Sequence, residues 1–439
     1  MTAISGDVQS RITAGGEMNQ SRRLFRALAV TSVAGAAMLM VVTTSGASGS
    51  SGNNPPAKGA PVKIGISLSL TGDFSADGIA FQQGYNLWAA DVNKQGGLLG
   101  HKVDLIVKSD ASSTTQVVTN YESLISTDHV SLTFGPFSSL LTEPAARAVD
   151  RYGYAMVEGA GGAPSVFSAG LKNVFDVALP VANSLVPFAT WISSLPKAQR
   201  PKTVAYATSD DPFTEPQIPV AQKIMSAAGI KTVYYKVFPA EATDFSSIAD
   251  NVVSAKAQVV VLGSVDVPTV QAFMQAFEQA HYSPKAFIAT AGPDQGAAFI
   301  KVAGKSNADG VMVPNSWYGL AANAASKAMV AEYIKKYGGT PAGVNADVAE
   351  AYAVGQVVAD AVKATGGFNN AKIIAYLHSG VTFKTVLGSA KFNALGENPV
   401  MTAYTFQWQG TTGNKFVQVN PVGDPNTVKI EYPKAVWGK

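Results

Sequence analysis

The segment from residue 130 to residue 164 contains two consecutive strand–turn–helix patterns and constrains the fold more than any other part of the chain. A short apolar strand stops at Gly135, and a hydroxyl-bearing turn at residues 137–139 precedes a helix. A second strand at residues 154–157 ends in a glycine-rich turn at residues 159–164. Open α/β sheets bind ligands at the carboxyl ends of neighbouring parallel strands, where small residues let the backbone approach a ligand closely. The segment therefore predicts a binding cleft.

Strands and helices also alternate on both sides of this segment. An alternating strand at residues 62–68 precedes a helix at residues 78–93 and a second strand at residues 103–108. The same order is repeated from residue 203 to residue 290. Such alternation is typical of parallel sheets joined by right-handed crossovers. The sequence thus predicts an α/β protein with two similar doubly wound parallel-sheet lobes.

Three segments are expected to cross between these lobes, so that they form a three-strand hinge. We expect lobe 1 to comprise residues 62–180 and 315–400, and lobe 2 to comprise residues 181–314 and 401–439. A hinge of this kind lets a cleft close around a ligand.

The amino terminus has the features of an export signal. A basic stretch at residues 21–26, with the twin arginines Arg22 and Arg23, precedes an apolar run at residues 27–42 and then small residues. The apolar run is shorter than the ~20 residues that a spanning helix needs, although an uncleaved membrane anchor is the alternative. We expect residues 1–47 to hold a signal peptide, with an amino-terminal extension if Met18 is the start, and residues 48–61 to form a flexible linker. The twin arginines resemble the export signal for folded proteins.

The absence of cysteine and the small net charge limit how the protein can be anchored and which partners it can bind. The chain has no cysteine, so the sequence predicts neither a disulfide nor the lipid-bearing cysteine of a lipoprotein. Its net charge of +3 is small and gives no electrostatic case for nucleic acid. The sequence predicts an exported protein of the periplasm or the cell surface.

Three motifs occur in the order that is typical of one protein family. A strand ends at Thr71-Gly72, a helix ends in the segment at residues 91–100, DVNKQGGLLG, and a Gly-Pro-Phe-Ser-Ser loop lies at residues 135–139. The chain resembles the type I solute-binding proteins of ABC importers, in particular the branched-chain amino-acid-binding group, over about residues 62–420. The resemblance implies a periplasmic-binding-protein type I fold, a small ligand such as an amino acid in the interlobe cleft, an ABC permease as partner, and a monomer without cofactor or metal.

The resemblance also places ligand contacts in lobe 1. Ser139 falls where the family binds the ligand carboxylate through a hydroxyl, although a serine that caps the following helix explains the same residue type. Ala160 falls where a backbone carbonyl meets the ligand ammonium. Gly162 falls where the family usually has a threonine, and this departure puts recognition of an α-amino acid in doubt. The adjoining Phe137, Ser138 and Gly161 complete the predicted loops.

Lobe 2 offers two further candidates by the same resemblance. Phe213 matches an aromatic residue that covers the ligand, and a core phenylalanine is the alternative. Asp294 is the nearest candidate for the acidic partner of the ligand ammonium, with a solvated loop aspartate as the alternative and Asp266 as a weaker candidate.

Two more aspartates stand at positions that often form the pocket for the ligand side chain. If Asp77 and Asp347 both point inward, the pocket would prefer a polar or cationic group, and the buried carboxylates would need a partner. The sequence alone favours surface positions for both, Asp77 in the first loop and Asp347 at a helix start, where an aspartate interacts favourably with the helix dipole.

Nothing in the sequence supports catalysis. The chain contains none of the common nucleophile, zinc-protease or P-loop motifs, and it has no cysteine nucleophile. Its four histidines show no metal-ligand spacing. We therefore expect a binding protein, with a ligand sensor uncoupled from import or an extracellular enzyme on the same scaffold as alternatives.

Overall fold

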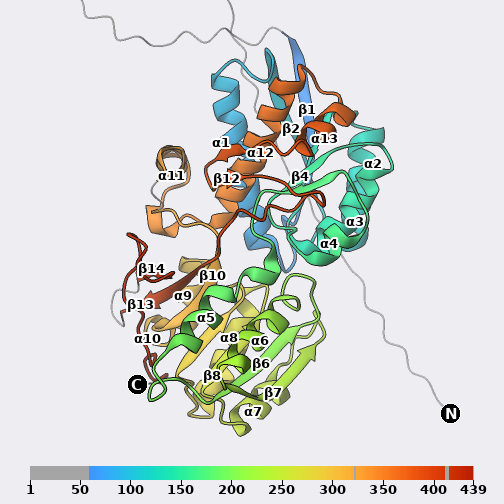
Figure 1. Cartoon of the computed structure of the whole chain (residues 1–439). Coiled ribbons are helices and arrows are strands. Elements are labelled where there is room, and N and C mark those ends of the chain that lie inside the picture. Colours follow the sequence, from blue (N-terminus) through green and yellow to red (C-terminus); the bar gives the residue numbers. More distant parts are fainter. Residues whose placement is uncertain (1–58, 321–322, 411–414, 439) are drawn as a thin grey trace, which may run out of the picture. The chain divides into compact units, whose positions relative to one another are not determined.

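The structure is a computed structural model that describes residues 59–320, 323–410 and 415–438. The predicted signal peptide and residues 48–58 of the predicted linker lie outside the described residues. The described residues belong to one compact unit, and they contain a five-stranded sheet, a seven-stranded sheet and a two-stranded sheet (Figure 1).

The five-stranded sheet has the order β2-β1-β3-β4-β5, and all its strand pairs are parallel. Its strands are β1 (Gly59–Leu68), β2 (His101–Ser109), β3 (Leu132–Phe134), β4 (Met156–Glu158) and β5 (Val174–Asp176). One face packs against α1 (Ser75–Lys94) and α12 (Ala346–Thr365), and the other against α2 (Thr114–Ser126), α3 (Ser139–Asp150) and α4 (Pro164–Ser168). Helices on both faces explain why the short central strands are buried throughout.

The seven-stranded sheet has the order β14-β13-β10-β9-β8-β6-β7. Its strands are β6 (Thr203–Ser209), β7 (Lys231–Phe238), β8 (Val259–Gly263), β9 (Ala286–Ala289), β10 (Val311–Asn315), β13 (Tyr404–Gln409) and β14 (Lys415–Asn420). Its helices are α5 (Val186–Ser194) and α6 (Gln217–Ala227) on one face, and α7 (Ser246–Ser254), α8 (Val267–Gln279), α9 (Ala297–Ala303) and α10 (Lys305–Ala308) on the other.

The two doubly wound sheets confirm the predicted fold class. The chain passes between them after β5, after β10 and before β13, because α12 packs on the first sheet while β13 and β14 return to the second. The remaining elements are α11 (Ala324–Tyr337), α13 (Asn370–Leu377), the hairpin strands β11 (Phe383–Thr385) and β12 (Gly388–Ala390), and two short 3₁₀ helices, η1 (Val181–Asn183) and η2 (Pro341–Gly343).

Two details differ from the sequence-based expectation. The second sheet is not entirely parallel, because β13 pairs antiparallel with both β10 and β14. In addition, β1 begins at Gly59, inside the segment predicted as linker. The Gly59 amide donates a hydrogen bond of 3.1 Å to the Gly100 carbonyl, so pairing with β2 extends the strand backwards.

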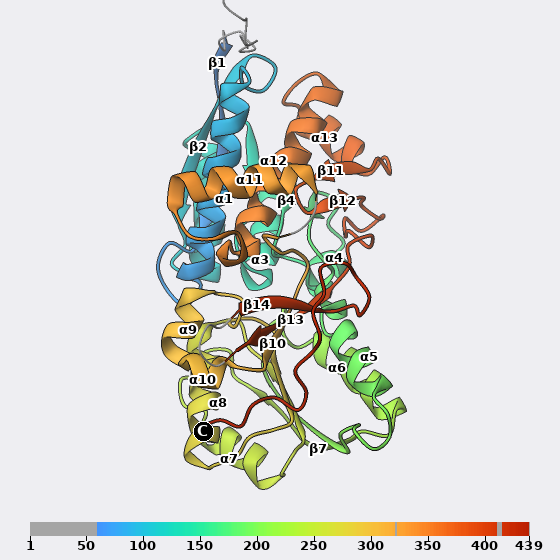
Figure 2. The same cartoon turned by 90° about the vertical axis from the view of Figure 1, so that its left-hand side faces the viewer.

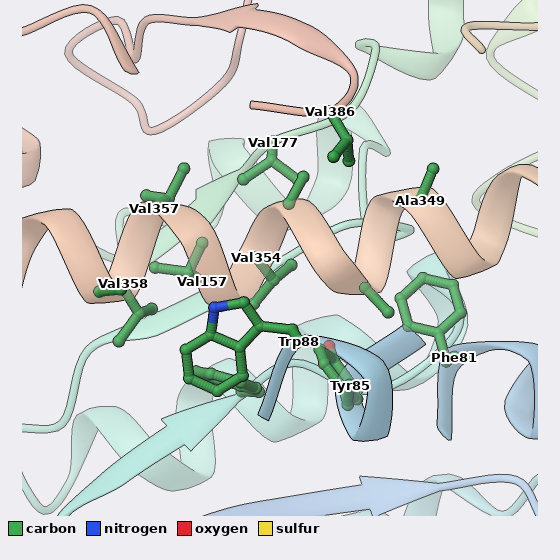
Figure 3. Packing of buried hydrophobic residues seen from close by; sticks show 14 of the residues in the cluster. Phe81, Tyr85, Trp88, Val157, Val177, Ala349, Val354, Val357, Val358 and Val386 are labelled. Carbon is green, nitrogen blue, oxygen red and sulfur yellow. The ribbon is translucent and has the colours of Figure 1, made fainter. Parts of the chain in front are cut away.

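Helices far apart in sequence form the centre of the first lobe. Both α11 and α12 pack against α1 (Figure 2). Helix α12 is buried on nearly every side, which fits its Ala- and Val-rich sequence. Trp88 and Tyr85 of α1 lie against Val354 and Val358 of α12 (Figure 3). A Cβ atom on Gly355 would lie 2.2 Å from the Trp88 ring, so a glycine is required where the two helices approach most closely.

Within the described residues, we find no helix whose length and apolar character would allow it to cross a bilayer.

Candidate ligand-binding cavity

A cavity of about 110 Å³ lies where the loops of both large sheets meet. Its walls come from the carboxyl ends of β3, β4 and β5 in the first sheet, from the loops after β6, β8 and β9 in the second, and from β10, α1 and α12. All but two of the predicted site residues line it: Asp77, Phe137, Ser138, Ala160, Gly162, Phe213, Asp294 and Asp347. The exceptions are Ser139 and Gly161.

Of the two adjacent serines after β3, Ser138 lines the cavity, and the expected Ser139 does not. Helix α3 begins at Ser139, whose hydroxyl donates a 3.4 Å hydrogen bond to the Ala160 carbonyl. Ser138 occupies the position before the helix, but its side chain makes no capping hydrogen bond. Its Oγ is shielded from solvent and has no partner among the described residues. A buried hydroxyl without a partner is costly, so it is available to a ligand.

Glu158, which the sequence did not indicate, shapes the glycine-rich loop after β4. Its Oε2 accepts a 2.8 Å hydrogen bond from the Ala160 amide and a second hydrogen bond from the Gly161 amide. A Cβ atom on Gly161 would lie 2.6 Å from Thr142, because this backbone packs against α3 instead of lining the cavity.

Steric exclusion explains why position 162 holds a glycine. A Cβ atom there would lie 2.7 Å from Oδ2 of Asp176 and 2.7 Å from the Leu179 carbonyl. Asp176 comes from β5 and is fully buried. The space that a threonine side chain would need at this position is therefore filled by a carboxyl group.

The second sheet contributes an aromatic wall and an acid. Phe213 lies in the loop after β6 and is half-buried, and its amide donates a 2.7 Å hydrogen bond to Asp211. Asp294 follows β9 and accepts hydrogen bonds from the Gly292 amide at 2.9 Å and from Asn315 Nδ2 at 3.2 Å. By contrast, Asp266 caps α8 through the Thr269 amide at 2.7 Å and does not line the cavity.

The surface positions that the sequence favoured for Asp77 and Asp347 are wrong. Asp77 is only 5% exposed, and both aspartates line the cavity. The two carboxyl groups lie close enough to shift each other's pKa, and Gln295 donates a hydrogen bond to Asp77 Oδ1. The reason is that α1 begins at Ser75, which places Asp77 in the first helical turn facing the cavity.

A fourth lining carboxyl group, Glu350, was missed. It lies three residues after Asp347 on α12, so both side chains share one helix face, a spacing that could have revealed it. Its Oε1 accepts a 3.4 Å hydrogen bond from the Ser316 hydroxyl. Among the described residues that line the cavity, none is Lys, Arg or His.

Burial of these acids in one small space governs their protonation. Loss of water raises the pKa of Asp77 to about 7 and that of Asp294 to about 6. The same desolvation, with repulsion from the neighbouring acids, raises the pKa of Asp347 and of Glu350 well above the usual range. Burial and mutual repulsion therefore favour the protonated forms of Asp347 and Glu350 more strongly than those of exposed acids.

The arrangement of the acids does not suit a metal ion. No group of three or more His, Cys, Asp or Glu side chains in the part of the chain that the structure describes is placed to hold one. The cavity is instead a mixture of apolar walls and carboxyl groups, which is the usual character of a small-molecule site.

Comparison with known proteins agrees with this architecture. A family model described as periplasmic binding protein matches residues 61–414. The Leu/Ile/Val-binding protein homolog 7 of Brucella suis is 25% identical over 383 residues, covering 82% of this chain and 92% of the relative.

Solved structures show the same fold. LivJ, the branched-chain amino acid transporter substrate-binding protein of Streptococcus pneumoniae in complex with isoleucine, has a TM-score of 0.70 at 20% identity and covers 82% of this chain and 99% of its own. A solute-binding protein of an ABC transporter from R. palustris, in complex with 4-hydroxybenzoate, has a TM-score of 0.69 at 16% identity and covers 86% of this chain and 99% of its own. Since the family model matches well over half of the sequence, the resemblance to the Leu/Ile/Val-binding group is confirmed, and the chain belongs to the periplasmic binding protein family.

Proposed function

We propose that this protein is the extracytoplasmic solute-binding component of an ABC transporter, which binds a small organic molecule in the cavity and delivers it to the membrane permease. The observation that carries the proposal is the cavity, whose walls come from the strand-end loops of both large sheets. Membership of the periplasmic binding protein family supports the extracytoplasmic location and argues against catalysis.

Binding would follow from the two-lobe arrangement. The lobes are residues 62–180 with 315–400 and residues 181–314 with 401–439, and the three connections between them act as the hinge. The ligand would first meet the loops at Ser138 and Ala160, and Phe213 and Asp294 of the second lobe would then complete its enclosure. The permease would recognise the closed form.

The test is thermal unfolding of the full chain against a library of amino acids, amines, amides and aromatic acids. A ligand that binds only the native state raises the melting temperature by mass action, by an amount that grows with ligand concentration. We expect at least one class of small molecule to do so. A flat response across all classes would contradict the proposed function.

Replacing Phe213 with alanine is expected to weaken binding of any ligand found in this screen roughly tenfold. The ring forms an apolar wall of the cavity, and burying a side chain of this size against a ligand contributes about 1.5–3 kcal/mol. Titration calorimetry measures the change. The control is Tyr152→Ala, which removes an exposed ring outside the cavity and should leave affinity unchanged. Equal affinities of F213A and wild type would remove Phe213 from the site.

Ser138→Ala and Ser139→Ala form a matched pair that separates the two serines. Loss of the unpartnered Ser138 hydroxyl should weaken ligand binding by about 1 kcal/mol, since its hydrogen bond is free for the ligand. Loss of the Ser139 hydroxyl, which already bonds to the Ala160 carbonyl, should have a smaller effect. The opposite order of affinities would restore Ser139 as the ligand contact.

A further inference from the structure

We propose that the ligand of this cavity is a small organic cation, an ammonium or amidinium ion on an apolar body, that carries no carboxylate. The proposal rests on the proposed function, because it assigns a chemical class to the same site. It departs from the amino acid and aromatic acid complexes among the structural neighbours.

The first observation is that four carboxyl groups face one cavity whose described lining residues supply no counter-charge. Their hydrogen-bond partners in the protein are neutral: Gln295 for Asp77, Gly292 and Asn315 for Asp294, and Ser316 for Glu350. Asp347 lies near the carboxyl group of Asp77, which repels it. Oδ2 of Asp347 is shielded from solvent and has no hydrogen-bond partner among the described residues. Grouped buried acids are costly without a cation, and a cationic ligand would supply the missing charge.

The second observation is independent of the acids in the cavity and concerns the donors that a ligand carboxylate would need. In the loop after β4, the Ala160 and Gly161 amides both donate to Oε2 of Glu158, so a carboxylate of the protein already occupies them. Asp176 fills the space beside Gly162 where a hydroxyl side chain could otherwise stand. A ligand carboxylate would therefore find the amides of this loop already occupied, and it would add to the negative charge of the site.

The third observation is the unused Ser138 hydroxyl together with the apolar walls. Ser138 lines the cavity at 5% exposure, and its Oγ lacks a partner among the described residues. A hydroxyl can accept a hydrogen bond from an N–H group of a cation as well as donate one. Phe137, Leu179, Phe213 and Val265 also line the cavity and suit an apolar body. The ligand is thus a cation with a hydrocarbon part.

Binding of a cation is coupled to proton release. Asp77, Asp294, Asp347 and Glu350 line the cavity. The buried Asp176 and Glu158 are close enough to Glu350 to repel it, and Glu397 is close enough to repel Asp176. All the groups named around the site are acids, so a bound cation favours their ionised forms. Affinity for the cation should therefore rise with pH between about 5 and 8 as the acids of pKa about 6 and about 7 ionise.

The experiment is titration calorimetry of the full chain with isosteric sets: acetamidinium, acetamide and acetate; benzamidinium, benzamide and benzoate; and leucine as the zwitterion. At pH 8 we expect the cation of at least one set to bind at least tenfold more tightly than its neutral and anionic isosteres. Its affinity should fall at least tenfold at pH 5, and the heat should differ between buffers of low and high ionisation enthalpy because protons are released.

Substitutions of two cavity aspartates test whether the preference for a cation arises in this cavity. Asp294→Asn and Asp347→Asn should each reduce the preference for the cation over the amide at least tenfold, with a cooperative thermal unfolding transition as the check on folding. Asp250→Asn, an exposed aspartate of α7, is the matched control and should keep the preference.

The outcomes separate the two proposals. Tighter binding of a carboxylate, of leucine or of the neutral amide would overturn the assignment of a cation and leave the solute-binding function standing. If no compound of the sets binds and the broader thermal library is also without effect, both proposals fail. A cation preference that survives both cavity variants would show that the cation binds elsewhere and would also overturn the assignment.

Discussion

Replacing Gly355 with alanine is expected to destabilise the protein by about 3 kcal/mol. The added Cβ atom would lie 2.2 Å from Cδ2 of Trp88, a ring that is 1% exposed and packed in the core. Overpacking of a well-packed core typically costs about 1–3 kcal/mol, and contact between a helix backbone and a large buried ring is at the upper end of that range. Urea unfolding of the full chain measures the change.

The control for this variant lies just beyond the same helix. A Cβ atom on Gly367 would meet no atom within 4 Å, so Gly367→Ala should change the free energy of unfolding by less than about 0.5 kcal/mol. The losses from Gly355→Ala and Trp88→Leu should be less than additive in the double variant, because the smaller side chain vacates the space that the added methyl group needs. Wild-type stability of G355A alone would contradict the close approach of α1 and α12.

The ligand-free protein is expected to lose stability as the pH rises from about 5 to about 8. Burial raises the pKa of Asp294 to about 6, that of Asp77 to about 7 and that of Asp176 to about 8, all above the value of 3.8 that an exposed aspartate has. The folded state therefore binds more protons than the unfolded chain in this interval, and its stability, which is complete below about pH 4, is lost as the pH rises through these values. A tenfold change in proton affinity corresponds to about 1.4 kcal/mol, so the raised pKa of Asp294 alone accounts for on the order of 3 kcal/mol.

Urea midpoints at several pH values test this dependence without ligand. Asp176→Asn should flatten the curve above about pH 7, because Oδ1 of an asparagine can still accept the 2.7 Å hydrogen bond from the Ala178 amide without titrating. Stability that stays constant or increases from pH 5 to pH 8 would show that these acids remain in contact with water.

The fold could be predicted from sequence because its signals are local. The turn at Gly135 and the glycine-rich turn after Glu158 end neighbouring parallel strands, and both loops line the cavity as expected. The antiparallel hairpin of β13 and β14 was missed, since strand direction depends on long-range pairing with β10, which no local pattern indicates.

The site was predicted less completely, because shifts of one or a few residues at helix starts determine which side chains face the cavity. A difference of one residue at the start of α3 exchanges Ser139 for Ser138, and the early start of α1 turns Asp77 inward. Helix boundaries are uncertain by this much in any sequence-based prediction. Asp176 reaches Gly162 only through the packing of β5 beside β4, so its role could not be read from the chain alone.

A crystal structure of the full chain with the amidinium or amine that binds most tightly would test the cation site at the level of atoms. We expect the ligand in the cavity between the loops of the two sheets, with its nitrogen within about 3 Å of the Asp294 and Asp347 carboxyl groups and its apolar body against Phe213. A ligand bound elsewhere on the protein, with this cavity occupied by water, would contradict both the site and the class of ligand proposed for it.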